Sequence, residues 1–412
     1  MLEWKLIRLG DICKTNENSY YPKDNWKFVN YLDTGSLTEN KITELQYINT
    51  KTDKMPSRAR RKVIKNSILY STVRPNQLHY GIIKEPVDNL LVSTGFTVID
   101  VDTNKAIPEF IYYLLIQNNT TEQLQAIAEQ SVSTYPSIKP SDIENLEFKL
   151  PNLIIQSKIV SILDTVDSKI CQNEKINNNL EQQAQAIFKE WFIDNPENNE
   201  WSTGTFSELI KSTLNGDWGK EAPTGNNTEK VYCIRGADIP EVKAGNKGKM
   251  PTRYILPKNY VAKQLTAGDI VVEISGGSPT QSTGRCTAIT QSLLDRYDSG
   301  MVCTNFCKAL KSKEGYSLFI YYYWQYMYGK GVFFSYENGT TGIKNLDFSG
   351  FIETETILIP PIDKIIAFDN YCNSIFSQIF ANGKQNEHLA VLRDTLLPKL
   401  MSGELDVSNI DL

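Results

Sequence analysis

The chain has 412 residues, of which 41% are hydrophobic and 22% charged, a composition typical of a soluble globular protein with two or three domains. The formal net charge of -5 does not indicate a nucleic-acid or anionic-membrane partner, although a net figure can hide a local basic patch. Apolar runs fall far short of the roughly 20 residues that span a bilayer, and the start of the chain lacks a signal-peptide apolar region. We therefore expect a cytoplasmic protein.

The sequence offers few groups for catalysis or metal binding. Its seven cysteines never form a CxxC pair, and only two histidines occur, so the residues argue against a disulfide framework, a zinc site or a histidine-based nucleophile. The segment "SGGSPTQSTGR" lacks the spacing of both common phosphate-binding glycine loops. Asp269 and Glu273 lack the following lysine that a nuclease metal pair would have. These absences disfavour an enzymatic function.

The second half of the chain echoes the first. Trp4 corresponds to Trp201 at a shift of 197 residues, and "VSTGF" from Val92 matches "VCTNF" from Val302 at a shift of 210. Matches that keep their order along the chain predict an internal duplication.

Each copy ends in one long periodic helix. From Ile159 to Trp191 apolar residues recur at alternating spacings of four and three, and a shift of 209 gives the same pattern from Phe368 to Leu400, with Leu392 covering for Arg393. Prolines precede both helices, and Gly403 is suited to end the second. The predicted seam consists of Ile159, Leu163, Val166, Ile170, Asn173, Asn177, Leu180, Phe368, Ile375, Ile379, Asn382, Asn386, Leu389 and Leu396.

Asparagines fall at the same two central levels of both helices, which favours mutual packing, because paired amides satisfy each other and fix the register. The first helix would be about 50 Å long. If it leaves one copy and enters the other, the second helix can pack along it only in the antiparallel sense. The sequence thus predicts two related globular parts joined by an antiparallel two-helix coiled-coil spacer, with a pseudo-two-fold axis. Two unrelated amphipathic helices on separate cores remain the alternative.

The parts before each helix, residues 1–150 and 196–359, have the patterns of an α+β fold. "SILYSTV", "STGFTVIDV", "KVYCI" and "GDIVVEI" indicate strands, while "PEFIYYLLIQ" and "YSLFIYYYWQYMY" indicate apolar helices. The tyrosines between residues 321 and 328 suit either a base-stacking platform or a buried helix, and the run favours the buried helix.

Positive charge gathers at equivalent places in the two copies. Residues 51–74 hold eight basic side chains against one acid, and residues 242–263 hold six against none. A polar loop follows each patch, with side chains that suit phosphates and base edges, although solvated faces and plain turns have similar compositions. The predicted DNA contacts are Arg58, Arg60, Arg61, Lys62, Arg74, Asn76, His79, Tyr80, Lys243, Lys247, Lys249, Arg253, Ser278, Thr280, Gln281, Thr283 and Arg285.

These features resemble the specificity subunit of Type I restriction-modification systems over essentially the whole chain. The helix that starts at "LPNLIIQSKIV" and closes with "FKEWF" is similar to the first conserved helix of that family, and "LRDTLLPKLMSGEL" is similar to the end of the second. The resemblance implies a target-recognition domain in residues 1–150, a spacer helix in 151–195, a second target-recognition domain in 196–359, and a second spacer helix with a tail in 360–412.

The resemblance also implies a non-catalytic reader of a bipartite, asymmetric site in double-stranded DNA. Its partners would be modification subunits, in two copies, and restriction subunits. S-adenosylmethionine, ATP and magnesium would bind those partners, and this chain would bind no cofactor or metal. Two other functions stay open from the residues alone: a coiled-coil scaffold that binds proteins and does not recognise DNA, and an autonomous nuclease.

Overall fold

The structure is a computed structural model that describes residues 4–131, 135–195, 197, 200–278, 280–339 and 343–410. The predicted domain limits at residues 1, 196 and 412 lie outside these ranges. Backbone contacts divide the chain into two compact units: unit 1 is Met1–Asp167 with Val391–Leu412, and unit 2 is Ser168–Ala390. Each unit therefore holds one globular part and a portion of each of the two longest helices.

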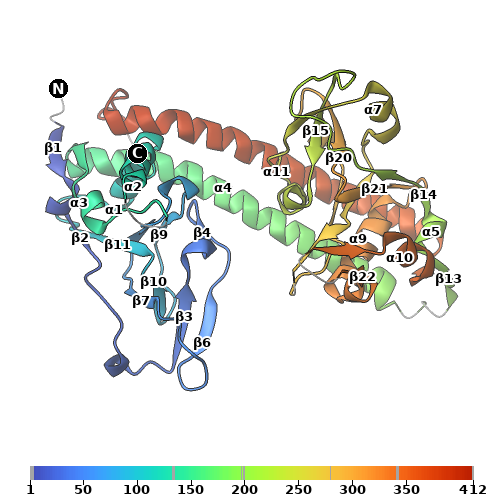
Figure 1. Ribbon diagram of the computed structural model, residues 1–412, viewed down its shortest axis with the longest axis horizontal. Helices are drawn as coiled ribbons and strands as arrows, with labels where there is room; N and C mark the ends of the chain where they lie inside the picture. Colours follow the sequence, from blue (N-terminus) through green and yellow to red (C-terminus); the bar gives the residue numbers. More distant parts are fainter. Residues whose placement is uncertain are drawn as a thin grey trace. The chain divides into compact units, whose positions relative to one another are not determined.

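Two long helices cross the boundary between the units in sequence (Figure 1). Helix α4 is Leu153–Phe188 and continues as a π-helical turn, Lys189–Ile193, while α11 is Ile362–Ser402. Gly403 follows α11 with φ +78°, the left-handed conformation that commonly ends a helix. Both long helices predicted from the heptad pattern are present.

Within unit 2, α4 and α11 run antiparallel. Asn173 Nδ2 donates to Asn386 Oδ1 at 2.8 Å, and Asn382 Nδ2 donates to Asn177 Oδ1 at 2.8 Å. Residue numbers rise along one helix as they fall along the other, which defines the antiparallel sense. All four amides are less than 10% exposed, so within each pair one amide takes the place of water as the hydrogen-bond partner of the other.

Within unit 1 the same two helices also run antiparallel. Arg393 Nη1 donates to Asp167 Oδ1 at 3.1 Å, and Lys158 Nζ donates to the Ser408 carbonyl at 2.7 Å. The expectation that Leu392 covers for Arg393 is wrong. Leu392 is 47% exposed, whereas Arg393 itself faces the neighbouring helix, where an acidic residue makes a charged side chain acceptable.

Ten of the fourteen predicted seam residues are buried, and four, Ile170, Leu180, Leu389 and Leu396, are partly buried. Unit 1 contains Ile159, Leu163 and Val166 in its buried set. Phe368 and Ile375 belong to the core of unit 2.

Unit 1 combines two four-stranded sheets. The first has the order β2-β11-β8-β9 and the second β6-β3-β10-β7, and a separate pair, β1-β12, joins the start of the unit to the strand before α4. The strands are β1 Lys5–Arg8, β2 Cys13–Thr15, β3 Phe28–Leu32, β4 Leu37–Thr38, β5 Lys41–Ile42, β6 Gln46–Asn49, β7 Ala59–Lys62, β8 Ser67–Ser71, β9 Tyr80–Ile83, β10 Leu90–Ser93, β11 Phe96–Val101 and β12 Glu147–Leu150. The helices besides the long ones are α1 Pro108–Leu115, α2 Asn118–Glu129 and α3 Pro140–Glu144.

Unit 2 repeats this plan with sheets β14-β21-β17-β19 and β16-β15-β20 and the pair β13-β24. It adds a small sheet, β18-β23-β22. The strands are β13 Ser202–Thr205, β14 Ile210–Asn215, β15 Glu229–Ile234, β16 Thr252–Ile255, β17 Ile270–Glu273, β18 Ser275–Gly276, β19 Cys286–Ala288, β20 Gly300–Cys303, β21 Cys307–Ser312, β22 Glu337–Asn338, β23 Lys344–Leu346 and β24 Thr356–Ile359. The helices are α5 Phe206–Leu209, α6 Ile239–Lys243, α7 Pro257–Lys263, α8 Gln291–Leu294, α9 Ser317–Gly329 and α10 Phe348–Thr354.

The strand registers correct the repeat alignment by one residue. In both units the second sheet contains one parallel pair of strands. In unit 1 it pairs Val92 with Leu32, the last residue of β3, and in unit 2 it pairs Cys303 with Ile234, the last residue of β15. Val92 therefore corresponds to Cys303 and not to Val302. Phe96 pairs with the last residue of β8, as Cys307 pairs with the last residue of β17, so the same shift of one holds at the next strand. Sequence matching placed the two phenylalanines together, whereas backbone pairing separates them.

Helices α1 and α9 supply the apolar cores that the sequence predicts. Tyr321 and Tyr322 are each 1% exposed and Tyr323 is 5% exposed, so this run belongs to the core and is no platform for bases. The expected strand "STGFTVIDV" is broken, because β10 ends at Ser93 and β11 begins at Phe96. Six of the seven cysteines are buried as free thiols, and burial raises the pKa of Cys233 to about 12, which keeps that thiol protonated.

Candidate nucleic-acid interface

The two predicted polar loops occupy the same connection in the two units. The first loop, residues 72–79, joins β8 to β9, and the second loop, residues 274–285, joins β17 to β19. The strands β8, β9, β17 and β19 hold the corresponding places in their sheets. Similar scaffolds thus carry two loops that differ in length and in side chains.

Backbone strain and side-chain contacts fix the shape of the first loop. Arg74 and Leu78, on either side of the turn Pro75–Gln77, both have positive φ, at 49° and 58°. The Arg74 guanidinium lies 4.8 Å from the centre of the Tyr135 ring, a cation-π contact. His79 Nδ1 lies 2.7 Å from the Leu37 carbonyl and 2.9 Å from Thr38 Oγ1.

The first loop leaves one predicted base contact open to solvent. Asn76 is exposed, while its backbone N–H donates to Gln125 Oε1 at 3.2 Å. Tyr80 is only 7% exposed and stacks on Tyr70 with ring centres 5.8 Å apart, so it belongs to the core of unit 1. The prediction that Tyr80 contacts DNA is therefore at odds with its burial.

A half-buried glutamate outside the sequence-predicted set, Glu337, holds the second loop. Glu337 Oε1 accepts from Thr283 N at 2.6 Å and from Thr283 Oγ1 at 3.0 Å, and Lys344 Nζ donates to Glu337 Oε2 at 2.7 Å. Burial by itself raises the pKa of Glu337, but the hydrogen bonds from Lys344 and Thr283 outweigh it and hold this pKa below its usual value. No local pattern signals this role, since Glu337 lies 54 residues from its partner.

Helix α9 supports the same loop from behind. Trp324 Nε1 donates to the Gly284 carbonyl at 2.8 Å, and Tyr328 OH donates to the Ser282 carbonyl at 3.2 Å. Arg285 makes two hydrogen bonds to Glu273, at 2.7 and 2.8 Å. Arg285 is thus already engaged, whereas Thr280 and Gln281 are exposed at the loop tip and Ser278 is half-buried in its turn.

The first basic patch presents two exposed arginines. Arg58 and Arg60 lie beside and on β7, with their side chains open to solvent. Lys62 pairs with Asp24 at 2.9 Å and lies 5.2 Å from the Trp26 ring. Arg61 is half-buried, and burial lowers its pKa. The alternation of strand residues explains why neighbours in this run differ in exposure.

The second basic patch is mostly tied into unit 2. Lys243 lies 3.7 Å from Glu181, and Lys247 lies 3.9 Å from Glu387. Arg253 is 7% exposed, its guanidinium lies 3.9 Å from the centre of the Trp218 ring, and its Nε donates to the Trp218 carbonyl at 2.9 Å. The structure therefore places Arg253 inside the unit and not on a DNA-facing surface, while Lys249 remains exposed.

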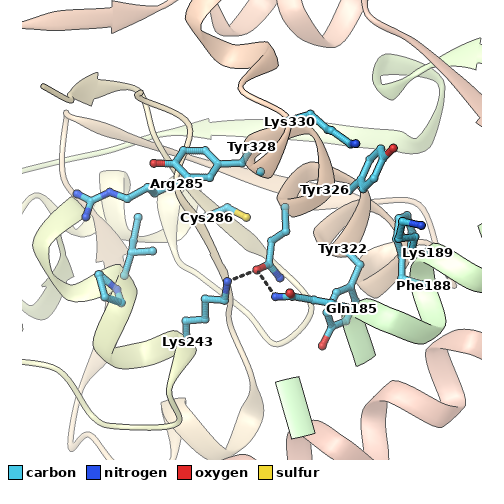
Figure 2. A pocket seen from close by; sticks show the side chains of 14 residues that line it. Gln185, Phe188, Lys189, Lys243, Arg285, Cys286, Tyr322, Tyr326, Tyr328 and Lys330 are labelled. Atoms are coloured by element: carbon cyan, nitrogen blue, oxygen red, sulfur yellow. Dashed lines mark hydrogen bonds between the residues drawn. The ribbon is translucent and has the colours of Figure 1, made fainter. Parts of the chain in front are cut away.

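A cavity of about 610 Å³ lies behind the second loop, between α4, α6 and α9 (Figure 2). Gln325, one of the lining residues, accepts a hydrogen bond from Lys243 and another from Gln185 at 3.4 Å. Tyr328 and Arg285, the last residue of the second loop, line the same cavity, and Tyr328 OH donates to the Ser282 carbonyl of that loop.

The described residues contain no group of three or more histidine, cysteine or acidic side chains that could hold a metal ion. Asp269, one of the two carboxylates considered for a nuclease site, pairs with Lys311 at 2.8 Å, and Glu273 pairs with Arg285. Both carboxylates are therefore neutralised by structural partners. In the part of the chain that the structure covers, no helix is both long and apolar enough to cross a bilayer.

Comparison with known proteins points in one direction. Residues 1–182 match the family described as "Type I restriction modification DNA specificity domain". The HindI specificity subunit of Haemophilus influenzae is 27% identical and aligns over 98% of this chain and 100% of its own length. The MjaIX specificity subunit of Methanocaldococcus jannaschii is 26% identical, over 98% of this chain and 94% of that protein.

A solved structure agrees at the level of the fold. The S subunit of the Type I restriction-modification system of M. genitalium superposes with a TM-score of 0.55 at 14% identity, covering 99% of this chain and 97% of that one. The family match and the two specificity subunits confirm the resemblance seen in the helix motifs, and the chain is similar to specificity subunits of Type I restriction-modification systems over nearly its whole length.

Proposed function

We propose that this chain reads a bipartite DNA site for a Type I restriction-modification complex. Each unit would read one half of the site with its polar loop, 72–79 in unit 1 and 274–285 in unit 2. The observation that carries the proposal is the common strand order of the two units, which puts a polar loop at the same connection twice. Since the side chains of the two loops differ, we expect two different half-sites and hence an asymmetric target.

The two long helices would form the spacer between the two reading modules. The antiparallel amide pairs Asn173–Asn386 and Asn177–Asn382 support this role, because buried amides specify a register that apolar side chains alone leave free. In this proposal the helix length sets the number of unread base pairs between the half-sites.

The chain would direct the chemistry of partners and perform none itself. Modification subunits, two per complex, would methylate adenine with S-adenosylmethionine, and restriction subunits would use ATP and magnesium to translocate and cleave. The exposed faces of α4 and α11, including the segment after Phe188, would bind the modification subunits. The neutralised carboxylates Asp269 and Glu273 support a non-catalytic role.

The proposal is tested by identifying the methylated motif and then measuring binding. Methylation sequencing of the host genome should give a bipartite adenine motif that disappears when this chain is deleted. The purified full chain, with modification subunits, should then bind a duplex with that motif more tightly than duplexes in which either half is scrambled. Equal binding to all three duplexes, or no binding, would favour the protein-scaffold alternative.

A further inference from the structure

An exposed phenylalanine lies at the base of the second polar loop. Phe306 is 58% exposed and follows Asn305, also exposed, in the turn between β20 and β21. A single exposed aromatic residue needs no explanation by itself, since folded surfaces contain many apolar atoms. Its backbone contacts make this one different.

The backbone of Phe306 is held on both sides. Its N–H donates to Thr304 Oγ1 at 2.9 Å, and its carbonyl accepts from Ile274 N at 2.8 Å and from Ser275 N at 3.2 Å. Ile274 and Ser275 are the first two residues of the second loop. Phe306 is therefore anchored to the start of that loop, and its side chain extends into solvent from a turn that hydrogen bonds hold in place.

Unit 1 has a glycine in the same place. Gly95 is the residue before β11, as Phe306 is the residue before β21, and the Gly95 carbonyl accepts from Thr72 N, the first residue of the first loop, at 2.8 Å. A Cβ on Gly95 would lie 2.5 Å from Thr34 Oγ1, so Thr34 closes the space that a side chain would need. The two units thus share this backbone hydrogen bond and differ in the side chain of the residue that accepts it.

The surface beside Phe306 is polar and includes Lys344, which is paired with Glu337. In the small sheet next to the loop, Ser275 pairs with Asn345 and Gly276 pairs with Lys344. Lys344 Nζ lies 4.9 Å from the centre of the Phe334 ring, which is 45% exposed. Apolar groups flanked by lysine and amide side chains are suited to nucleic acid, where they meet base faces or thymine methyl groups between phosphates.

We propose that Phe306 is a specificity-determining residue of unit 2 that packs its ring against a base of the half-site read by the second loop. The inference rests on the proposed DNA-reading function. It adds an apolar contact to a base in the half-site that unit 2 reads. Unit 1 has no equivalent contact, because Gly95 at the matching position has no side chain. Two geometries share this chemistry: the ring against a base face, with local unstacking, or the ring against a thymine methyl group.

The test uses the full chain with its modification subunits, and F306G as the variant, because glycine stands at the matching position of unit 1. Val261→Ala is the matched control, since Val261 is 82% exposed in the same unit on α7. Binding is measured to the cognate duplex, to a scrambled duplex, and to a series in which one base of the half-site at a time is removed. Thermal unfolding checks that both variants fold.

We expect F306G to weaken cognate binding on the order of tenfold, with scrambled-duplex binding and thermal unfolding unchanged. One missing base in the half-site of unit 2 should weaken the wild-type protein and leave F306G unaffected. Permanganate-reactive thymine at that step supports the base-face geometry, and sensitivity to deoxyuridine supports the methyl contact. Equal cognate binding by wild type and F306G, or equal weakening on both duplexes, overturns the inference while the reading function stands. A wild-type complex that cannot tell cognate from scrambled DNA overturns both.

Discussion

Asn382 Nδ2 donates to Asn177 Oδ1 at 2.8 Å, and Asn177 Nδ2 in turn donates to the Ile379 carbonyl at 3.0 Å and to the Ala244 carbonyl at 3.1 Å. The side chain of Asn177 therefore hydrogen-bonds both to α11 and to the loop after α6. Next to it, a Cβ on Gly383 would lie 1.9 Å from the Gly245 carbonyl, so only glycine in α11 allows this loop to approach. The amide pair and the glycine contact together hold α4, α11 and the loop after α6 in one arrangement within unit 2.

Asn177→Ala should lower the free energy of unfolding by about 1 to 3 kcal/mol, because the buried Nδ2 of Asn382 loses its acceptor and the carbonyls of Ile379 and Ala244 lose the Asn177 side-chain donor. Asn178→Ala, at an exposed neighbour on the same helix, is the control and should have little effect. Chemical denaturation of both variants gives the comparison. If the two variants unfold alike, the amide pair does not stabilise this interface.

The contact between Glu337 and Thr283 predicts a pH-dependent loop. The folded-state pKa of Glu337 lies below its usual value, so the stabilisation is present above the ordinary carboxyl range and is lost as pH falls through the folded pKa. Glu337→Gln should therefore reduce stability and cognate DNA binding at pH 7. The difference from wild type should shrink as pH falls below about 4. Unfolding measured against pH provides the test, with the exposed Glu353→Gln as control, and a constant difference across that range would contradict the assignment.

The exposed arginines of the first basic patch should act through phosphates. Replacing Arg58 and Arg60 by alanine should weaken binding to cognate and scrambled DNA alike. It should also flatten the dependence of log K on log salt, by about 0.9 for each phosphate that the variant no longer neutralises. Binding isotherms at several salt concentrations measure the slope, and Lys5→Ala, on the separate pair β1-β12, is the control. An unchanged slope would show that these arginines do not contact DNA phosphates.

Arg253 should behave in the opposite way. Since it is stacked on Trp218 and bonded to the Trp218 carbonyl, Arg253→Leu should destabilise unit 2 by about 1 to 3 kcal/mol. The salt dependence of DNA binding should stay as in wild type. Thermal unfolding and the salt slope, measured on one preparation, separate the two roles, and a slope that falls with normal stability would restore Arg253 as a phosphate contact.

The proposed spacer role predicts that helix length controls the unread gap. Matched seven-residue insertions, between Asp167 and Asn173 in α4 and between Asn386 and Arg393 in α11, should keep both amide pairs and add about 10 Å of helix. The methylated motif should then widen by about three base pairs, at the rise of roughly 3.4 Å per base pair. An insertion in one helix alone should break the pairing. Methylation sequencing of cells that carry each variant reads out the gap, and an unchanged motif would show that the helices do not measure it.

The sequence alone determined the features that repeat along the chain. The heptad pattern predicted α4 and α11 with asparagines at their centres, and apolar runs predicted the helices α1 and α9. Such helical patterns are local, because each residue shares a face with its neighbours three and four positions away. The motifs in the two long helices also carried the family resemblance. Strand patterns located β8, β11, β15 and β17, with an error only where the turn between β10 and β11 interrupts a continuous apolar run.

Only the tertiary structure decided which side chains remain available at the candidate interface. Arg253 and Arg58 look alike in sequence, yet one is stacked on Trp218 and the other is exposed. Glu337 hydrogen-bonds Thr283 of the second loop although 54 residues separate them. The strand registers show that Phe306 corresponds to Gly95 and not to Phe96. Exposure and ion pairing depend on partners brought together by long-range packing. The order of residues along the chain does not encode that proximity locally, so these assignments required the fold.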